Sequence, residues 1–306
     1  VGESGSGKTM TGLSLIRLLP SVFGINHGSI TFDGEEVHKM TGRQLNELRG
    51  GRIGMIFQEP QSMLDPSATV GSQVAESLKF HRKLDKQVTK ARVIELLREV
   101  GIPEPEVRSR NYAHQMSGGM AQRAMIAAAL SADPHLLIAD EPTTALDVTV
   151  QSQILKLLDR ERRERKLAIL LITHDLTVVS ALADRVLVMY AGRIVEEGPT
   201  HKILTNPRQP YTQALLRCSL LEAGDQQELY SIPSGEDSGI ETVSGCAFLP
   251  RCMTASDAGV AEKCKQEKPP IRRYSEDCHA RCWAVSASEY SVGDHGKFHE
   301  PKEGAP

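Results

Sequence analysis

An eight-residue segment beside the start of the chain constrains the fold more than any other part of the sequence. Residues 2–9 read G-E-S-G-S-G-K-T and fit the pattern G-x-x-x-x-G-K-[ST] of a phosphate-binding loop, or P-loop. Its glycines let backbone amides close around phosphate oxygens without Cβ atoms in the way. We expect Lys8 to reach the β- and γ-phosphates of a nucleotide and the Thr9 hydroxyl to bind Mg²⁺. The predicted phosphate-binding residues are Gly2, Glu3, Ser4, Gly5, Ser6, Gly7, Lys8 and Thr9.

The segments that flank this loop decide between a nucleotide site and a chance match. Apolar residues from Leu13 to Leu19 predict a helix that runs to Pro20, and its N-terminal dipole would face the phosphates. A strand usually precedes the motif, and only Val1 stands in its place, so a Gly/Ser-rich loop that fits by chance stays an alternative. A natural domain would not begin inside this motif. We therefore expect the chain to be an N-terminally truncated fragment that lacks the first strands of its domain.

Length and charge limit the classes of function. A chain of 306 residues can form one large domain with a smaller appendage. With 36 basic and 39 acidic residues, the net charge of −3 gives no bulk electrostatic reason to bind nucleic acid. Apolar runs such as residues 167–172 fall far short of the roughly 20 residues that span a bilayer. Any role at a membrane must therefore come through a partner protein.

A pair of carboxylates follows a short apolar run. Residues 136–139 read L-L-I-A and predict a buried strand, and Asp140 and Glu141 come directly after it. Ligand sites of α/β sheets lie at the carboxyl ends of the strands. Asp140 is expected to hold Mg²⁺, directly or through water, and Glu141 to polarise the attacking water. The alternative is a helix N-cap with ordinary solvated acids.

A second helix start of the phosphate-binding kind lies at Ser117, Gly118 and Gly119. Ser117 is a plausible N-cap, the two glycines free backbone amides, and the apolar residues 124–130 continue the helix. A single ATP molecule does not need two phosphate-binding helix starts from the same chain. We therefore expect two subunits to lie head to tail, with each of these segments closing on the ATP of the other subunit. A capped helix without a ligand is the alternative.

The order of these motifs resembles that of ABC ATPases over roughly residues 1–200. Residues 116–120 resemble the ABC signature, Gln58 resembles the Q-loop glutamine, and residues 145–147, which end in Asp147, resemble the D-loop. His174, at the end of an apolar run, resembles the switch histidine that contacts the γ-phosphate. The resemblance implies an α/β fold with a mostly parallel core sheet, an antiparallel β-subdomain and a helical subdomain. It also implies that Gln58 joins Thr9 and Asp140 around Mg²⁺.

Other segments resemble the ATPases of oligopeptide and dipeptide importers. They include F-Q-E-P at 57–60, L-D-P at 64–66, T-T-A-L-D-V-T-V-Q at 143–151 and P-Y-T at 210–212. Asp65 and Ala121 depart from the usual Asn and Arg of that group, at positions without a chemical role.

This resemblance implies a subunit on the cytoplasmic face of the inner membrane that hydrolyses ATP to drive peptide import. Its expected partners are a second ABC ATPase subunit, two integral-membrane permease subunits and an extracytoplasmic peptide-binding protein. No nucleic-acid partner is expected. An importer of nickel or another small solute, and a soluble ABC ATPase of DNA repair or translation, are the alternatives.

The predicted organisation has three parts. Residues 1–220 form the ATPase domain, residues 221–285 form a cysteine-containing extension of the oligopeptide-transporter type, and residues 286–306 form a loose tail. Within the first part, 60–130 is expected to be mostly helical, and the charged run 159–166 to be a solvated helix face. The region from about 221 onward is polar and is expected to be irregular.

Four of the six cysteines crowd into the extension with the spacing C-x5-C-x11-C-x13-C. G-C-A-F-L-P-R-C at 245–252 and C-H at 278–279 resemble the C-terminal region of peptide-importer ATPases. Four thiols in one segment suggest a metal or [4Fe–4S] site, although zinc or free reduced thiols are alternatives. The predicted ligands are Cys246, Cys252, Cys264 and Cys278, whereas Cys218 and Cys282 have no predicted role.

Overall fold

The computed structural model describes most of the chain, over residues 1–144, 146–219, 230–232 and 244–286. Two compact units make up the described residues. One combines residues 1–8 with the described residues from 173 onward, and the other spans residues 9–172. The predicted tail, apart from Ser286, and Ala145 of the predicted D-loop lie outside the described residues. No helix in the described part of the chain is both long and apolar enough to span a bilayer.

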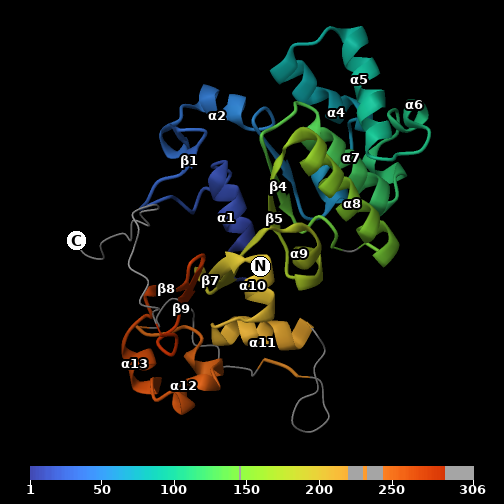
Figure 1. The fold of residues 1–306 in the computed structure, drawn as a ribbon. Helices are drawn as coiled ribbons and strands as arrows, with labels where there is room; N and C mark the ends of the chain where they lie inside the picture. Colours follow the sequence, from blue (N-terminus) through green and yellow to red (C-terminus); the bar gives the residue numbers. More distant parts are fainter. Residues whose placement is uncertain (145, 220–229, 233–243, 287–306) are drawn as a thin grey trace. The chain divides into compact units, whose positions relative to one another are not determined.

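A parallel three-stranded sheet lies at the centre of the unit that spans 9–172 (Figure 1). Its strands, in spatial order, are β3 (Ile53–Ile56), β4 (Leu136–Asp140) and β5 (Ala168–Ile172). β4 is the middle strand and has Leu137, Ile138 and Ala139 fully buried, as expected for a parallel sheet covered on both faces. The sheet confirms the mostly parallel core.

A helix and a hairpin pack beside this sheet. α1 (Lys8–Leu15) begins within the P-loop, as predicted, but ends before Pro20 because Arg17 takes the left-handed conformation at φ 52°. β1 (Thr31–Phe32) and β2 (Glu35–Glu36) form an antiparallel hairpin, and α2 (Gly42–Leu48) follows it. One apolar core joins these elements to the sheet, and its buried members are Ile16, Val37, Met40, Leu45, Leu48, Ile53, Ile138 and Ile172.

The segment between β3 and β4 is mostly helical, as the sequence predicts. Side-chain oxygens of Thr69, Asp85 and Ser117 accept hydrogen bonds from backbone amides at the starts of α4, α5 and α7, and these N-caps fix where the helices begin. Figure 1 shows α4, α5 and α6 beside α7. The elements are α3 (Pro60–Met63), α4 (Val70–Ser77), the π-helical turn η2 (Leu78–Arg82), α5 (Lys86–Glu99), α6 (Pro105–Arg108), η3 (Ala113–Gln115) and α7 (Gly118–Leu130).

The charged run 159–166 differs in part from the solvated face that the sequence predicts. It lies at the end of α8 (Val148–Arg165), where Glu161 is only 3% exposed. The Glu161 carboxylate accepts from Arg165 at 2.6 Å and from Arg160 at 2.7 Å. A buried charge must be paired, and two arginines of the same helix supply the partners: Arg165, one turn further on, and Arg160, the preceding residue.

An antiparallel four-stranded sheet forms the centre of the other unit. In spatial order its strands are β6 (Arg185–Tyr190), β7 (Arg193–Pro199), β9 (Cys278–Arg281) and β8 (Ile271–Ser275). β6 and β7 form a hairpin, and the turn at Ala191 and Gly192 has positive φ at both residues. The extension therefore contributes two strands to a sheet that begins in the predicted ATPase domain.

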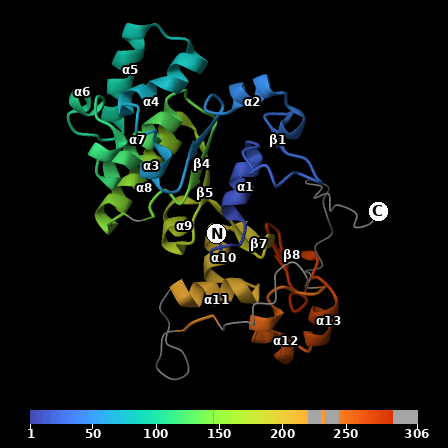
Figure 2. The ribbon, with the colours of Figure 1, turned by 180° about the vertical axis from the view of Figure 1, so that it is seen from behind.

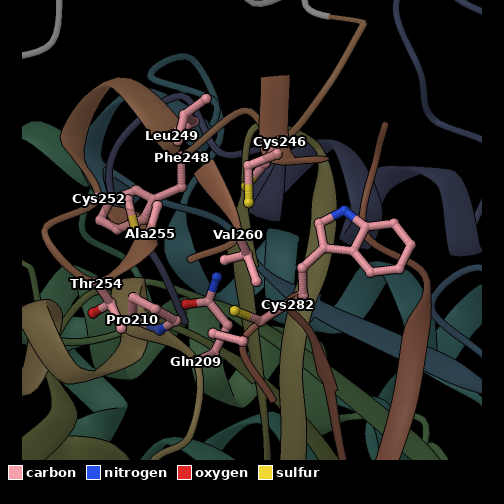
Figure 3. Close-up of a pocket in the computed structure, with 13 residues that line it drawn as sticks. Gln209, Pro210, Cys246, Phe248, Leu249, Cys252, Thr254, Ala255, Val260 and Cys282 are labelled. Atoms are coloured by element: carbon pink, nitrogen blue, oxygen red, sulfur yellow. The ribbon is translucent and has the colours of Figure 1, made fainter. Parts of the chain in front are cut away.

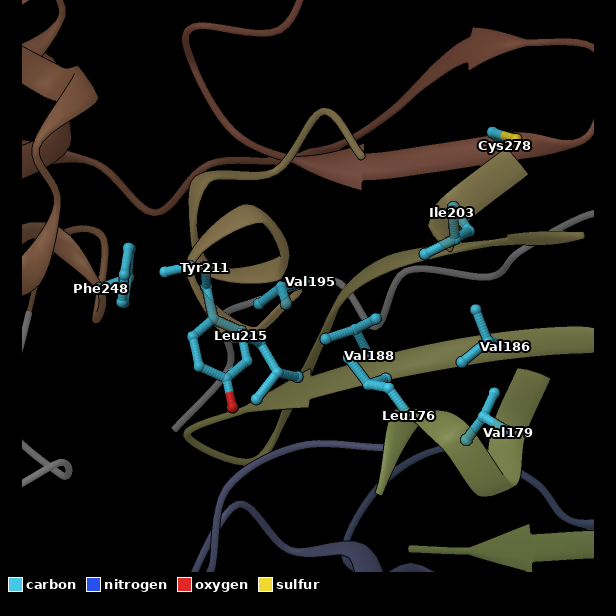
Figure 4. Close-up of a cluster of buried hydrophobic side chains, with 11 residues drawn as sticks. Leu176, Val179, Val186, Val188, Val195, Ile203, Tyr211, Leu215, Phe248 and Cys278 are labelled. Atoms are coloured by element: carbon cyan, nitrogen blue, oxygen red, sulfur yellow. The ribbon is translucent and has the colours of Figure 1, made fainter. Parts of the chain in front are cut away.

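The described part of the extension is more regular than its polar composition predicts. It contains short helices as well as β8 and β9, and Figures 1 and 2 show them beside these strands. Figure 4 shows the apolar core of this unit, to which Phe248 and Cys278 of the extension contribute. The helices of the unit are α9 (Leu176–Leu182), α10 (Thr200–Thr205), α11 (Pro210–Ser219), η5 (Leu249–Arg251), α12 (Thr254–Asp257) and α13 (Ala261–Gln266).

Candidate functional site

The glycines of the P-loop are required by its backbone. A Cβ on Gly2 would lie 2.1 Å from the carbonyl oxygen of Met189 on β6, so no side chain fits there. Gly5 and Gly7 have φ angles of +78° and +96°, in the region that favours glycine. Left-handed residues within a loop of this kind allow backbone N–H groups to form an anion-binding nest.

Two side chains of the loop fit a phosphate ligand. Lys8 is 8% exposed, and its Nζ donates to the carbonyl oxygens of Gly2 at 2.7 Å and Glu3 at 2.8 Å. The Ser6 side chain is 4% exposed, and its hydroxyl has no hydrogen-bond partner among the described residues. An orphaned buried hydroxyl beside a buried ammonium suits an anion that accepts hydrogen bonds.

The predicted Q-loop glutamine and the predicted catalytic glutamate meet at the end of β4. Glu141 follows β4 and donates its backbone N–H to the carbonyl oxygen of Ile172 at 2.8 Å. Its Oε2 accepts from Gln58 Nε2 at 3.3 Å and from Thr144 Oγ1 at 2.8 Å. Glu141 also has a positive φ of 46°, a strained conformation for a residue with a side chain, and such strain clusters at functional sites.

Oxygen donors suited to Mg²⁺ gather in the same unit. Asp140, the last residue of β4, is 2% exposed, and Gln58 follows β3, the neighbouring strand. Thr9 lies on α1 of this unit and is exposed. Carboxylate, amide and hydroxyl oxygens are the ligand types that Mg²⁺ prefers. The chemistry of this donor set fits the predicted metal.

The signature segment has the predicted helix-cap geometry. Ser117 is the N-cap of α7, and its hydroxyl accepts from the Met120 amide at 3.3 Å. A Cβ on Gly119 would lie 3.0 Å from a methyl carbon of Val150 on α8, so the second glycine permits close packing of the two helices. Asp147 caps α8 through its carboxylate, which accepts from the Val150 amide at 2.9 Å.

His174 follows β5 in the sequence, with Thr173 between the strand and the histidine. It belongs to the unit that contains the P-loop up to Lys8, whereas Gln58, Asp140 and Glu141 belong to the other unit. The neighbouring Asp175 caps α9 by accepting from the Thr177 amide at 2.7 Å.

One of the four predicted cysteine ligands, Cys278, does not line the pocket that the other three line. Cys278 is 1% exposed in β9 and packs in the apolar core, where its sulfur lies 2.7 Å from the position of a Cβ on Gly198. Strand alternation explains this position, because Cys278 and Ala280 share the buried face of β9. One pocket is lined by the other three predicted cysteines and by one further cysteine, Cys282. Figure 3 labels Cys246, Cys252 and Cys282 of this set, and the fourth member is Cys264.

These four thiols influence one another without forming a ready ligand set. Burial is the main reason that the pKa values of Cys246 and Cys282 are raised, and burial with the charges of neighbouring thiols raises the pKa of Cys264 to about 11. Within the described residues, no group of three or more His, Cys, Asp or Glu side chains is arranged to hold a metal ion. Sequence reasoning missed Cys282, and a C-x17-C spacing from Cys264 was the only signal for it.

Comparisons with known proteins bear on both the ATPase region and the extension. Residues 1–144 match the ABC transporter family, and residues 195–259 match the oligopeptide/dipeptide transporter C-terminal region. The dipeptide transport ATP-binding protein DppD of Escherichia coli (strain K12) is 40% identical over 297 residues, which cover 97% of this chain and 88% of that protein. The chain belongs to the oligopeptide/dipeptide group of ABC transporter ATPases.

Further relatives agree with this assignment. The oligopeptide transport ATP-binding protein OppD of Bacillus subtilis (strain 168) is 43% identical over 287 residues, covering 93% of this chain and 79% of that protein. The ATP-binding cassette MJ0796, solved as a dimer with ADP and Pi, matches with a TM-score of 0.58 and 27% identity over 65% of this chain and 83% of its own. The predicted ABC ATPase fold and family, and an ATPase activity coupled to transport, are confirmed.

Proposed function

We propose that this ABC ATPase hydrolyses ATP to drive the import of dipeptides or oligopeptides. The observation that carries the proposal is the meeting of Gln58 and Glu141 at the end of β4, within a peptide-transport ATPase family. A carboxylate in that place can accept a proton from an attacking water while an amide beside it helps to orient that water.

Each motif residue has a proposed role. Lys8 and the amides of residues 2–9 bind the β- and γ-phosphates, and the buried Ser6 hydroxyl faces the same ligand. Thr9, Asp140 and Gln58 hold Mg²⁺, which neutralises phosphate charge when bound. Glu141 orients and deprotonates water, and His174 and Gln58 contact the γ-phosphate. The proposed residues for the ATP of the partner subunit are Ser117, Gly118, Gly119 and Asp147.

The proposed assembly follows the family and the MJ0796 dimer. A second ABC ATPase subunit, identical or homologous, completes two ATP sites. The pair acts on two integral-membrane permease subunits at the cytoplasmic face of the inner membrane, where the chain is a peripheral subunit. An extracytoplasmic binding protein delivers the peptide. The proposed domain limits are 1–220 for the ATPase, 221–285 for the extension and 286–306 for the tail.

Reconstitution tests this function. The complete subunit, its permease subunits and its binding protein are placed in proteoliposomes, and ATP hydrolysis is followed with dipeptides, oligopeptides or chelated nickel. We expect the peptide-loaded binding protein to stimulate hydrolysis and peptide to accumulate. If chelated nickel stimulates ATP hydrolysis and peptides do not, the cargo is nickel and the proposal of peptide import is wrong. Copurification with nucleic acid, in place of permease subunits, would favour a soluble ABC ATPase.

We also propose a [4Fe–4S] cluster bound by Cys246, Cys252, Cys264 and Cys282. The support is that these four thiols line one pocket of the extension, and four thiolates complete the protein ligands of such a cluster. Cys282→Ser and Cys278→Ser form a matched pair for anaerobic purification with iron, sulfide and zinc analysis. Loss of iron only in Cys282→Ser is expected. Zinc without sulfide would indicate a zinc site, and the absence of any metal in the unmodified protein would refute the cluster.

A further inference from the structure

The extension contacts the P-loop directly, at Glu3. Arg251 donates from Nη1 to Glu3 Oε2 at 2.9 Å and from Nη2 to Glu3 Oε1 at 3.0 Å. The two parallel hydrogen bonds make a bidentate pair, the strongest geometry available to arginine and a carboxylate. Although 247 residues lie between them in the sequence, both residues belong to the same compact unit.

This ion pair is partly withdrawn from solvent. The side chains of Arg251 and Glu3 are 21% and 34% exposed, and the guanidinium also donates to the Tyr190 hydroxyl at 3.4 Å. The hydrogen bond to Glu3 is the main reason that the pKa of Arg251 is raised above its ordinary value. Exposed ion pairs contribute little, but a shielded bidentate pair holds its geometry better.

The backbone of Glu3 is held as well. Its N–H donates to the hydroxyl of Tyr211, a fully buried side chain of α11, at 2.8 Å. The same peptide group carries the Gly2 carbonyl, which accepts from Lys8 Nζ at 2.7 Å. Because a peptide group is planar, Tyr211 and Lys8 together fix the orientation of this one group. Glu3 thus connects Arg251, which binds its side chain, to Lys8, which binds the peptide group that precedes it.

Arg251 owes its position to the cysteine-containing loop. It is the last residue of η5, which lies between Cys246 and Cys252, and the Leu249 amide donates to the Cys246 carbonyl at 3.0 Å. The Cys246 amide donates to the Cys264 carbonyl at 2.7 Å, which ties the loop to α13. Phe248 also packs edge-on against the ring of Tyr211, with centroids 5.4 Å apart.

We infer that Arg251 is a positioning residue for ATP binding, through which the C-terminal extension holds the P-loop in its phosphate-binding conformation. The inference rests on the proposed binding of ATP phosphates by residues 2–9. A loop held in its binding conformation loses less conformational freedom when the ligand arrives, so the affinity rises. The chemical step depends on residues after β3 and β4, so Arg251 affects the affinity for ATP more than the turnover rate.

The first test measures ATP and ADP affinity and ATPase kinetics of Arg251→Ala in the complete subunit within its transporter. We expect the Kd and KM for ATP to rise about tenfold, which corresponds to 1.4 kcal/mol, while kcat changes less than about twofold. Arg251→Lys should recover only part of the affinity, because an ammonium cannot form the bidentate pair. Arg272→Ala is the matched control: this arginine also belongs to the extension, but its guanidinium stacks over Trp283 at 4.9 Å.

A double-mutant cycle separates positioning from general damage. Glu3→Gln weakens the same ion pair while it leaves the extension intact, and it carries the test if Arg251→Ala does not fold. We expect each single variant to lower ATP affinity without lowering the melting temperature by more than a few degrees. The double variant should bind ATP no more weakly than the single variant with the lower affinity.

Four outcomes would contradict these ideas, and they are distinguishable. Additive effects of Glu3→Gln and Arg251→Ala, or unchanged affinity in both, would overturn the role of Arg251. A fall in kcat at constant KM would also overturn it. Failure of the unmodified protein to bind ATP would instead overturn the proposed function on which the inference rests.

Discussion

Replacing Glu141 by glutamine is the sharpest test of the catalytic site. The glutamate Oε2 accepts from Thr144 Oγ1 at 2.8 Å and from Gln58 Nε2 at 3.3 Å. A glutamine has the same shape, and its amide oxygen can still accept from both groups. We therefore expect the folded structure and ATP binding to survive in Glu141→Gln, because only the ability to accept a proton is removed.

The magnitude follows from the role assigned to the carboxylate. Loss of a general base typically lowers the rate about 10²–10⁴-fold, or about 3–5 kcal/mol in activation free energy. Removing only one hydrogen bond to a charged group costs less, about 1.5–3 kcal/mol. Thr144→Val removes the shorter of the two hydrogen bonds and keeps the base, so it should lower the rate less than Glu141→Gln does.

The assay is phosphate release by the assembled transporter at saturating Mg²⁺ and ATP, with ATP affinity from calorimetry and the melting temperature from circular dichroism. We expect Glu141→Gln to keep its affinity and melting temperature while hydrolysis falls at least a hundredfold. Turnover within tenfold of the unmodified protein, at unchanged affinity, would remove Glu141 from the role of base and leave it a hydrogen-bonding residue only.

Three further predictions concern stability, and the first has a matched control variant. A Cβ in Gly54→Ala would lie 2.4 Å from a backbone oxygen of α7, so thermal unfolding should show a loss of about 1–3 kcal/mol, whereas Gly42→Ala, with nothing within 4 Å, should lose none. Asp85→Ala removes the N-cap of α5 and should cost about 1 kcal/mol by urea unfolding without changing ATP hydrolysis. Burial raises the pKa of Glu196, so folding favours its protonated form and loses stability as the pH rises from about 4 through that higher pKa. Glu196→Gln should therefore raise the melting temperature near pH 8 more than near pH 4, and equal changes at both values would contradict this.

Much of the fold was predictable because its signals are local. The apolar runs that became β3, β4 and β5 are short and end in polar residues, and the N-caps at Ser117 and Asp147 are visible as single residues. The P-loop pattern also predicts where α1 begins, since its last two residues open that helix. The end of α1 was not predictable, because it depends on Arg17 taking a left-handed conformation that no residue type announces.

The structure differs from the sequence-based expectations, or goes beyond them, where packing decides the surroundings of a side chain. Cys278 fits the family pattern in sequence, but the register between β9 and β7 turns its sulfur into the apolar core, and that register is invisible in one sequence. Glu161 looks like part of a solvated charged run until the packing of α8 buries it against two arginines. The contact between Glu3 and Arg251 joins two segments that are far apart in the sequence, and neither residue type alone points to the other.

The pairing of β7 with β9 has a practical consequence for shortened versions of the protein. Glu196 and Glu197 of β7 pair with Ala280 and His279 of β9, so β9 covers one edge of β7. A version cut at residue 220 would leave that edge with unpaired N–H and C=O groups, a template on which other chains can assemble. Such a product should self-associate and precipitate, because β9 no longer covers the edge of β7.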